Sequence, residues 1–203
     1  MRKLLISIRQ AIKRARVWII SIFLIYCLSC SIGIILSHQG NHFALNIRDK
    51  IVNKALTSDK ASKDYQKGNK LRAAVYDFCG NLFLGAVPQT VMGLGIIIPF
   101  ITVPVQGWIA GIVSVDNEHQ SRLRNIRSAA YYLIVLLLQF IPYSIAIGSG
   151  VKFGVDCYNY NKMHNSGLFH YKIKKESLTD LGYIFIAVIP LFFIASCFEF
   201  LSK

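Results

Sequence analysis

The sequence predicts an all-α polytopic membrane protein with about five transmembrane helices, an N-terminal amphipathic helix and a polar helical segment after the first span. Of its 203 residues, 54% are hydrophobic and only 16% are charged, whereas soluble domains are about a quarter charged. The charges leave long apolar blocks, and residues 78–115 contain no Lys, Arg, Asp or Glu. A chain of this length with several spans has room for a single membrane domain, which we assign to 17–203.

The net charge of +13 does not by itself indicate nucleic-acid binding. A basic surface is typical of nucleic-acid-binding domains, but here the basic residues occupy short segments that flank the apolar blocks. In that position they anchor helix ends at anionic lipid headgroups. We therefore expect the lipid bilayer as a partner, and no nucleic acid.

The N-terminal segment 1–16 is predicted to be a basic amphipathic helix on the membrane surface, ahead of a first span at 17–37. Its apolar residues recur at helical spacing, and it has no acidic residue. A cleaved signal peptide would have a shorter apolar region and a clear small-residue cleavage site, so we expect a retained span. The residues predicted to anchor this segment at the membrane surface are Arg2, Lys3, Arg9, Lys13, Arg14 and Arg16.

The polar segment 38–74 is predicted to contain a second amphipathic helix. Asn41 is a suitable N-cap residue, and Ala44, Ile47 and Ile51 follow at helical spacing. This helix would lie along the bilayer surface or dock onto a partner. The next stretch, "TSDKASKDYQKGNKLR", is predicted to be a solvated connector.

The uncharged block 78–115 is too long for one straight span. At about 1.5 Å per residue, such a helix would run almost twice the hydrocarbon thickness of about 30 Å. Prolines and glycines interrupt the block, and lipid tolerates a broken backbone only where protein neighbours or a cavity satisfy it. We predict two spans, at 75–91 and 95–115, joined by a turn near "VMGLG"; a re-entrant pair that does not fully cross is the alternative.

Two further spans are predicted at 129–151 and 181–201, with polar segments at 116–128 and 156–178. Lys and Arg are almost evenly divided between the two sides of this topology. Because the first helix and its basic flank usually dominate orientation, we expect the N-terminus to lie in the cytoplasm.

Two pairs of glycines have the spacing of closely crossing membrane helices. They are Gly107 with Gly111, and Gly150 with Gly154. Such pairs form either an oligomer interface or a crossing within one chain, and a five-span protein must first pack with itself. A homo-oligomer therefore stays an open alternative.

Four amide side chains lie inside the apolar blocks, at Asn81, Gln89, Gln106 and Gln139. Lipid cannot satisfy them, so each is expected to face the bundle interior and to bond another helix, for about 1 kcal/mol. The alternative is that they line a polar cavity or a groove for a partner.

Three charged residues lie near the ends of predicted spans. Asp77 opens the second span, Lys152 ends the fourth, and Glu199 lies near the end of the fifth. Ionisable residues inside a membrane are functional candidates by default. In the predicted topology Asp77 and Glu199 lie near the outer membrane face and Lys152 near the inner face, so we do not expect Lys152 to pair with Glu199.

The sequence contains no recognisable constellation for catalysis, cofactor binding or metal binding, and we predict that the protein is not an enzyme. The histidines fall in polar segments and lack the acidic partner of a metalloprotease motif. Cys27 and Cys30 form a CxxC inside an apolar run, without a second pair or a neighbouring histidine. We interpret these cysteines as small packing residues.

Four stretches of the chain follow the order of motifs in a known membrane family. An aromatic-rich "FCGNLFLGAVP", with Asn81 and Gly85, precedes "PVQGWIAGI"; "LLQFIPYSIAIGSGVKFG" and "IASCFEF" follow. Together they resemble the stage II sporulation protein M family. The chain departs from the family pattern at Gln106, where Asn is usual, at Gln139, near the usual Glu, and at Val135, where a His is expected.

The resemblance and the glycine pairs define the predicted contact residues of this chain. The residues predicted for helix packing or partner contact are Asn81, Gly85, Gln106, Gly107, Gly111, Gln139, Gly150, Gly154 and Glu199.

The resemblance implies a non-enzymatic scaffold or partner subunit of a multiprotein membrane complex that remodels the cell envelope or peptidoglycan. Relatives that accompany transport gene clusters imply an alternative, a permease-like subunit of a transporter or export system with an ATPase partner. Either role implies a bacterial plasma membrane and other membrane or envelope proteins as partners. No cofactor is expected.

Overall fold

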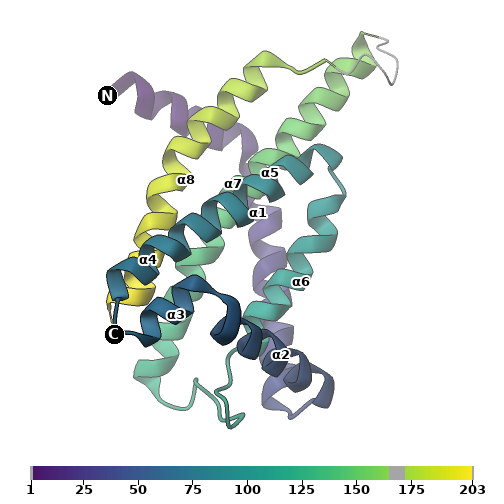
Figure 1. Cartoon of the computed structure of the whole chain (residues 1–203). Coiled ribbons are helices and arrows are strands. Elements are labelled where there is room, and N and C mark those ends of the chain that lie inside the picture. Colours follow the sequence, from purple (N-terminus) through teal and green to yellow (C-terminus); the bar gives the residue numbers. More distant parts are fainter. Residues whose placement is uncertain (1, 165–171, 203) are drawn as a thin grey trace.

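The computed structural model describes residues 2–164 and 172–202, and residues 1, 165–171 and 203 lie outside it. The described residues form helices and their connections, with no strand beyond one isolated bridge between Val115 and Ser121. The all-helical prediction is confirmed for these residues (Figure 1). The elements in order are α1 (Arg2–His38), α2 (His42–Ser58), α3 (Lys60–Gln66), α4 (Lys70–Cys79), η1 (Gly80–Ala86), α5 (Val87–Met92), η2 (Gly93–Gly95), α6 (Ile98–Ile112), α7 (Ile126–Met163) and α8 (Lys175–Leu201).

Among the described residues, three helices are long and apolar enough to cross a membrane: α1, α7 and α8. They pack on one another and form the body of the bundle. Helix α6 is apolar but has only 15 residues, and the stretch before it is divided among α4, η1 and α5. The structure therefore supports a membrane protein with three candidate spans, and the predicted count of five is not confirmed.

The surface helix predicted at 1–16 is not a separate element, because α1 continues through it without interruption. No proline or glycine lies near the expected boundary between Arg16 and Val17, so nothing there ends the helix. Figure 1 shows the N-terminal part of α1 at an angle to the remainder. Ala11 and Ala15 on this part are fully buried, and their small side chains let neighbouring helices approach closely.

The polar segment after the first span folds into two helices at one end of the bundle (Figure 1). The predicted cap is confirmed: Asn41 Oδ1 accepts a hydrogen bond from the backbone N–H of Ala44 at 3.1 Å. The stretch predicted as a connector instead contains α3. Asp59 caps this helix by accepting the N–H of Ser62 at 2.8 Å, and that local bond explains why a charged stretch forms a helix.

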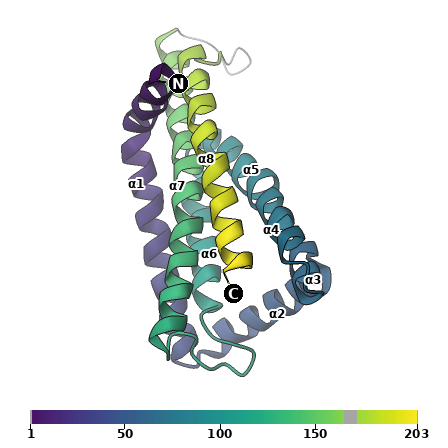
Figure 2. The same cartoon turned by 90° about the vertical axis from the view of Figure 1, so that its left-hand side faces the viewer.

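The uncharged block folds as a helical hairpin with its turn at the predicted place. Its first arm begins earlier than predicted, at Lys70, and its second arm ends at Ile112. The turn is η2, followed by Ile96 with a φ of 52°, which is unusual for a β-branched residue. Helix α6 packs along α1, whereas α4 packs on α8 and α5 on α7. Figure 2 shows α1 and α4–α5 along opposite edges of the bundle, so the two arms are splayed apart.

Helix α7 extends beyond the predicted span 129–151 and includes the start of the segment predicted as a polar insert, 156–178. Lys152 and Asp156, one turn apart, form an ion pair, which lets the helix continue through charged residues. Lys152 therefore pairs with Asp156. Within the described residues it does not pair with Glu199, and this absence was predicted. Residues 165–171 of the predicted insert lie outside the described ranges.

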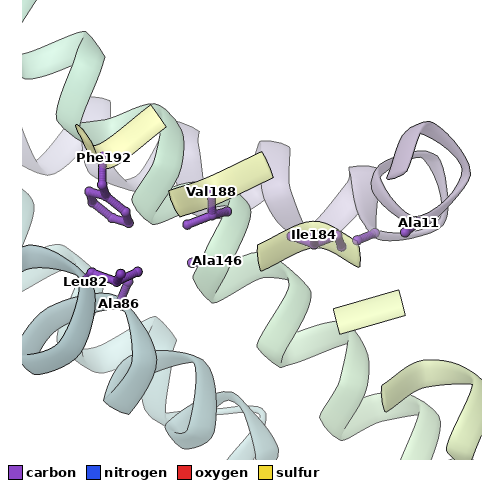
Figure 3. Packing of buried hydrophobic residues seen from close by; sticks show 8 residues of the cluster. Ala11, Leu82, Ala86, Ala146, Ile184, Val188 and Phe192 are labelled. Carbon is purple, nitrogen blue, oxygen red and sulfur yellow. The ribbon is translucent and has the colours of Figure 1, made fainter. Parts of the chain in front are cut away.

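Two clusters of buried side chains join the long helices. Figure 3 shows the first, in which Phe192 of α8 points toward Leu82 and Ala86 of η1. Its members are Ala11, Ala15, Leu82, Ala86, Ala146, Ile184, Val188 and Phe192. The second cluster joins α1, α6 and α7 through Ile22, Tyr26, Cys30, Val103, Phe140 and Ile147. In lipid such helices associate through close contact rather than water expulsion.

Charged side chains connect the three long helices at the end of the bundle opposite α2. Arg14 of α1 donates two hydrogen bonds to Asp180 of α8, one of them from Nε at 2.7 Å. Lys152 of α7 lies 3.9 Å from the same carboxylate, and Ser177 of α8 donates to Asp156 of α7. These bonds hold α1, α7 and α8 together at this end.

At the other end, a buried arginine holds α2 against the loop after α6. Arg48 is 2% exposed and donates to the carbonyl oxygen of Val115 at 3.2 Å and to Oδ1 of Asn117 at 2.9 Å. It also donates to Asp49, and this bond, with a smaller effect from His119, holds the pKa of Asp49 below its ordinary value. The Arg48–Asp49 pair therefore stabilises the fold at neutral pH and is lost as the pH falls through that lowered pKa.

Replacing Arg48 by Met is expected to release α2 from this loop. The change removes hydrogen bonds of a charged group, each worth roughly 1.5–3 kcal/mol, and leaves their acceptors without that donor. Limited proteolysis followed by mass spectrometry should show faster cleavage within α2 and α3, while α1, α7 and α8 stay intact. Lys50→Met, at an exposed position of the same helix, is the matched control, and equal cleavage rates in both variants would contradict the assigned role of Arg48.

Candidate functional site

The first glycine pair, Gly107 and Gly111 of α6, lies directly against α1. A Cβ on Gly107 would come within 2.1 Å of Ser29 Oγ, and one on Gly111 within 2.1 Å of the carbonyl oxygen of Cys30. Gly33 of α1 faces Gly111 and is equally small. The predicted close crossing therefore exists, and it lies within the chain.

The second glycine pair, Gly150 and Gly154 of α7, lies against the end of the hairpin's first arm. A Cβ on Gly150 would come within 2.3 Å of the carbonyl oxygen of Thr90, and one on Gly154 within 2.5 Å of that of Gly93. Both pairs thus serve crossings inside one molecule. Because they hold the two arms on different helices, they also create the space between the arms.

A cavity of about 550 Å³ lies between the two arms and α7. This volume is within the range of about 300–1,000 Å³ that is typical of small-molecule sites. Apolar side chains form most of the wall, with amide, hydroxyl and charged groups at a few positions. The lining residues are Tyr26, Asn81, Leu84, Gly85, Gln89, Gln106, Ile109, Ala110, Val113, Arg122, Tyr131, Tyr132, Val135, Leu136, Gln139, Phe140, Tyr143 and Glu199.

Tyrosine hydroxyls orient the amides that the two arms contribute to this cavity. Tyr26 of α1 donates to Gln106 Oε1 on α6 at 2.7 Å, and Tyr143 of α7 donates to Asn81 Oδ1 on η1 at 3.0 Å. Asn81 Nδ2 in turn donates to Asp77 Oδ2 of α4 at 2.9 Å. The predicted bonds from Asn81 and Gln106 to other helices are confirmed.

The polar network continues to α8. Gln139 of α7 donates through Nε2 to Glu199 Oε2 at 3.2 Å, and Ser196 donates to Asp77 Oδ2 at 2.6 Å. The side-chain oxygens of Gln89 and Gln139 are buried and have no hydrogen-bond partner among the described residues. Buried acceptors are rarely left unpaired, and both of these residues also line the cavity.

Asn81 and Gly85 belong to η1, a π-helical segment. Such segments occur frequently at functional sites. A Cβ on Gly85 would come within 2.2 Å of the Tyr143 hydroxyl oxygen, so a larger residue there would displace the hydroxyl that bonds Asn81. The backbone of η1 is therefore shaped to present this amide to the cavity.

Five of the residues predicted for helix packing or partner contact line the cavity: Asn81, Gly85, Gln106, Gln139 and Glu199. The remaining four are the glycines of the two crossings beside it. Five further lining residues were not predicted: Tyr26, Tyr131, Tyr132, Tyr143 and Arg122. A signal existed for two of the tyrosines, which lie within apolar runs, whereas tyrosine in membrane helices usually lies at the interface.

The basic residues predicted to anchor the N-terminal segment are all exposed on α1. Arg14 has a further role, because it also bonds Asp180 on α8. Its side chain nevertheless remains 49% exposed, which is compatible with contact with lipid headgroups. Membrane anchoring by these residues stays a prediction. They are Arg2, Lys3, Arg9, Lys13, Arg14 and Arg16.

The cysteines form no disulfide, since all five are free. Cys30 is buried at the crossing of α1 and α6, in agreement with its interpretation as a packing residue. Within residues 2–164 and 172–202, no group of three or more His, Cys, Asp or Glu side chains is placed to hold a metal ion.

Comparisons with protein-family models, with curated proteins and with solved structures find no match to this chain. The resemblance to the stage II sporulation protein M family is carried only by the motifs quoted above, and it stays a prediction. The cavity and its surroundings are therefore the features from which a function can be proposed.

Proposed function

We propose that this chain is a permease-like, non-enzymatic subunit of a membrane transport or export system. The cavity is the observation that supports the proposal most, because amides from both hairpin arms and from α7 meet at it. Polar and ionisable groups inside a membrane are costly, and they mark substrate pathways. An ATPase and other envelope proteins are the partners expected of such a subunit.

The proposal includes five membrane crossings. The hairpin turn packs against Gly150, close in sequence to Lys152 of the charged cluster, so the turn lies near the level of that cluster. The N-terminus and this turn lie toward one end of the bundle, and α2, α3 and the C-terminus lie toward the other (Figure 1). This alternation supports five crossings. The basic flank of the first helix is the reason to place the N-terminus in the cytoplasm of a bacterial cell, with α2 and α3 outside.

The crossings are tested with single cysteines at Ser58, Leu94, Glu118 and His164 in a cysteine-free background. Leu94 is chosen for the turn because a side chain at Gly93 would meet the backbone of α7. In intact cells, a membrane-impermeant reagent should label positions 58 and 118 but not 94 or 164. Labelling of 94 together with 58 and 118 would contradict a crossing hairpin, and the reverse pattern would contradict the orientation.

The permease-like role is tested with cysteines inside the cavity, at Ala110 and Val135. A pathway through the bundle should let a small water-soluble thiol reagent label both positions from either side of membrane vesicles. Leu133 and Ile101 are exposed on the outside of the bundle and serve as lipid-facing controls that should stay unlabelled. Labelling of the cavity from one side only, or from neither, would overturn the proposal.

A scaffold for envelope or peptidoglycan remodelling is the second candidate function, and α2 and α3 favour it. Arg48 fixes α2 at one end of the bundle, where this helix and α3 offer a polar surface to another protein. Photo-cross-linking from Asn46 and Asn53, both exposed on α2, tests this role in cells. A captured envelope protein together with an unlabelled cavity would favour the scaffold over the permease.

A further inference from the structure

The loop before α7 and the first turn of α7 carry three arginines, Arg122, Arg124 and Arg127. Arg122 lines the cavity, and we call this segment the arginine mouth. All three are exposed. Within the described part of the chain, their guanidinium groups make no hydrogen bond and no ion pair, unlike those of Arg14, Arg48 and Arg72, which bond carboxylates. Three unpaired guanidinium groups on one short segment concentrate positive charge at a single place.

These arginines line two hollows that share walls with the cavity. The first, of about 300 Å³, is lined by Arg122, Asn125, Arg127, Ser128, Tyr131 and Tyr132. The second, of about 630 Å³, is lined by Asp116, Ser121, Arg122, Arg124, Asn125, Ile126 and Ser128. Because Arg122, Tyr131 and Tyr132 also line the cavity, the basic surface is continuous with the apolar interior.

The beginning of α7 adds to this positive field. Asn125 caps the helix by accepting the N–H of Arg127 at 3.0 Å, and the free N–H groups of a helix start attract anions. Among the residues that the structure describes, Asp116 is the one carboxylate in the lining of these two hollows. Its Oδ1 already accepts the backbone N–H groups of Glu118 and Gln120. Guanidinium groups bind phosphate through paired hydrogen bonds.

We propose that the cavity and its arginine mouth bind a lipid with a phosphate headgroup. The phosphate contacts Arg122, Arg124 and Arg127, and an apolar chain enters between the hairpin arms. This inference rests on the proposed function and deepens it, because it names the chemical class of the molecule that the cavity accepts.

The lining of the cavity agrees with the orientation of such a lipid. Apolar side chains from both arms and from α7 provide a surface for the chain, among them Leu84, Ile109, Val113, Val135 and Leu136. The carboxylate of Glu199 also lines the cavity, and it disfavours an anionic group there. The phosphate is therefore expected at the arginine end, with the chain directed inward.

The site is tested by native mass spectrometry of the purified full-length protein with added phosphatidylglycerol. The triple variant Arg122→Gln, Arg124→Gln and Arg127→Gln should bind this lipid at least roughly tenfold more weakly than the wild type, because each cation near a lipid surface contributes measurably. The matched control removes three exposed lysines from α2 and α3 at the same end, Lys50→Gln, Lys54→Gln and Lys63→Gln, and should bind as the wild type does. Equal loss in both variants, or no loss in the arginine variant, would overturn the proposal.

Two competition experiments distinguish binding of the whole lipid from binding of its phosphate or its apolar chain alone. Diacylglycerol, which lacks the phosphate, and inorganic phosphate, which lacks the chain, should each compete poorly, and equal competition by either would overturn the proposal. An isoprenoid phosphate is compared with phosphatidylglycerol in the same assay. The lipid that binds more tightly identifies the class of lipid that carries the phosphate. Val135→Trp, which fills the cavity, should also weaken binding, whereas unchanged binding would mean that the chain does not enter. If cavity cysteines label from both sides but no phosphate lipid binds, this inference fails while the proposed function stands.

Discussion

Replacing Gly111 by Leu is expected to separate α1 from α6 and to destabilise the protein by roughly 3 kcal/mol or more, at the upper end of overpacking effects. A Cβ at this position would come within 2.1 Å of the carbonyl oxygen of Cys30 and 2.9 Å of the Cα of Gly33. Both atoms belong to the backbone of α1, so they cannot rotate away as the end of a side chain would. The helices must move apart, and the cluster that contains Tyr26 and Val103 loses its packing.

The effect of this substitution is measured by unfolding purified protein in detergent, with heat or with increasing dodecyl sulfate. The control is Gly182→Leu on α8, where no heavy atom of the described residues outside the local helix lies within 4 Å of an added Cβ. This control should unfold as the wild type does. A Gly111→Leu protein as stable as its control would contradict the close crossing of α1 and α6.

The turn of the hairpin could be predicted from the sequence because length alone excludes one straight span, and Gly93 and Gly95 lie near the middle of the block. The separation of the arms could not be predicted in the same way. It depends on which helix each glycine pair faces, and Gly111 faces α1 whereas Gly150 faces α5. Spacing identifies a small-residue surface, but it does not identify the surface that packs on it.

For the amides, too, the sequence predicts burial but not the residue that each amide contacts. Their burial could be predicted, because lipid cannot satisfy an amide. The bonding partners of Asn81 and Gln106 are tyrosines about 60 to 80 residues away in the chain, and no local pattern connects them. The continuity of α1 and the presence of α3 do not follow from charged composition, because caps and the absence of helix breakers decide where a helix begins and ends.

Replacing Asn81 by Leu is expected to break the polar network of the cavity and to cost roughly 1–3 kcal/mol, the range for leaving buried polar groups unpaired. The side chain of Asn81 accepts from Tyr143 and donates to Asp77. Without it, the Tyr143 hydroxyl loses the side-chain acceptor that orients it, and Asp77 keeps the bond from Ser196. The wall of the cavity also becomes apolar at this point, so a transport activity should fall together with stability.

A double-mutant cycle separates the Asn81–Tyr143 bond from general loss of packing. Asn81→Leu, Tyr143→Phe and the double variant are unfolded under the same conditions, and residues in direct contact should show a coupling of roughly 0.5–3 kcal/mol. Asn159→Leu, at an exposed position of α7, is the matched control for the loss of an amide and should not couple to Tyr143→Phe. Additive effects of Asn81→Leu and Tyr143→Phe would mean that the two side chains act independently. Coupling confined to the Asn81 cycle would instead show that one hydrogen bond joins the first hairpin arm to α7 across the wall of the cavity.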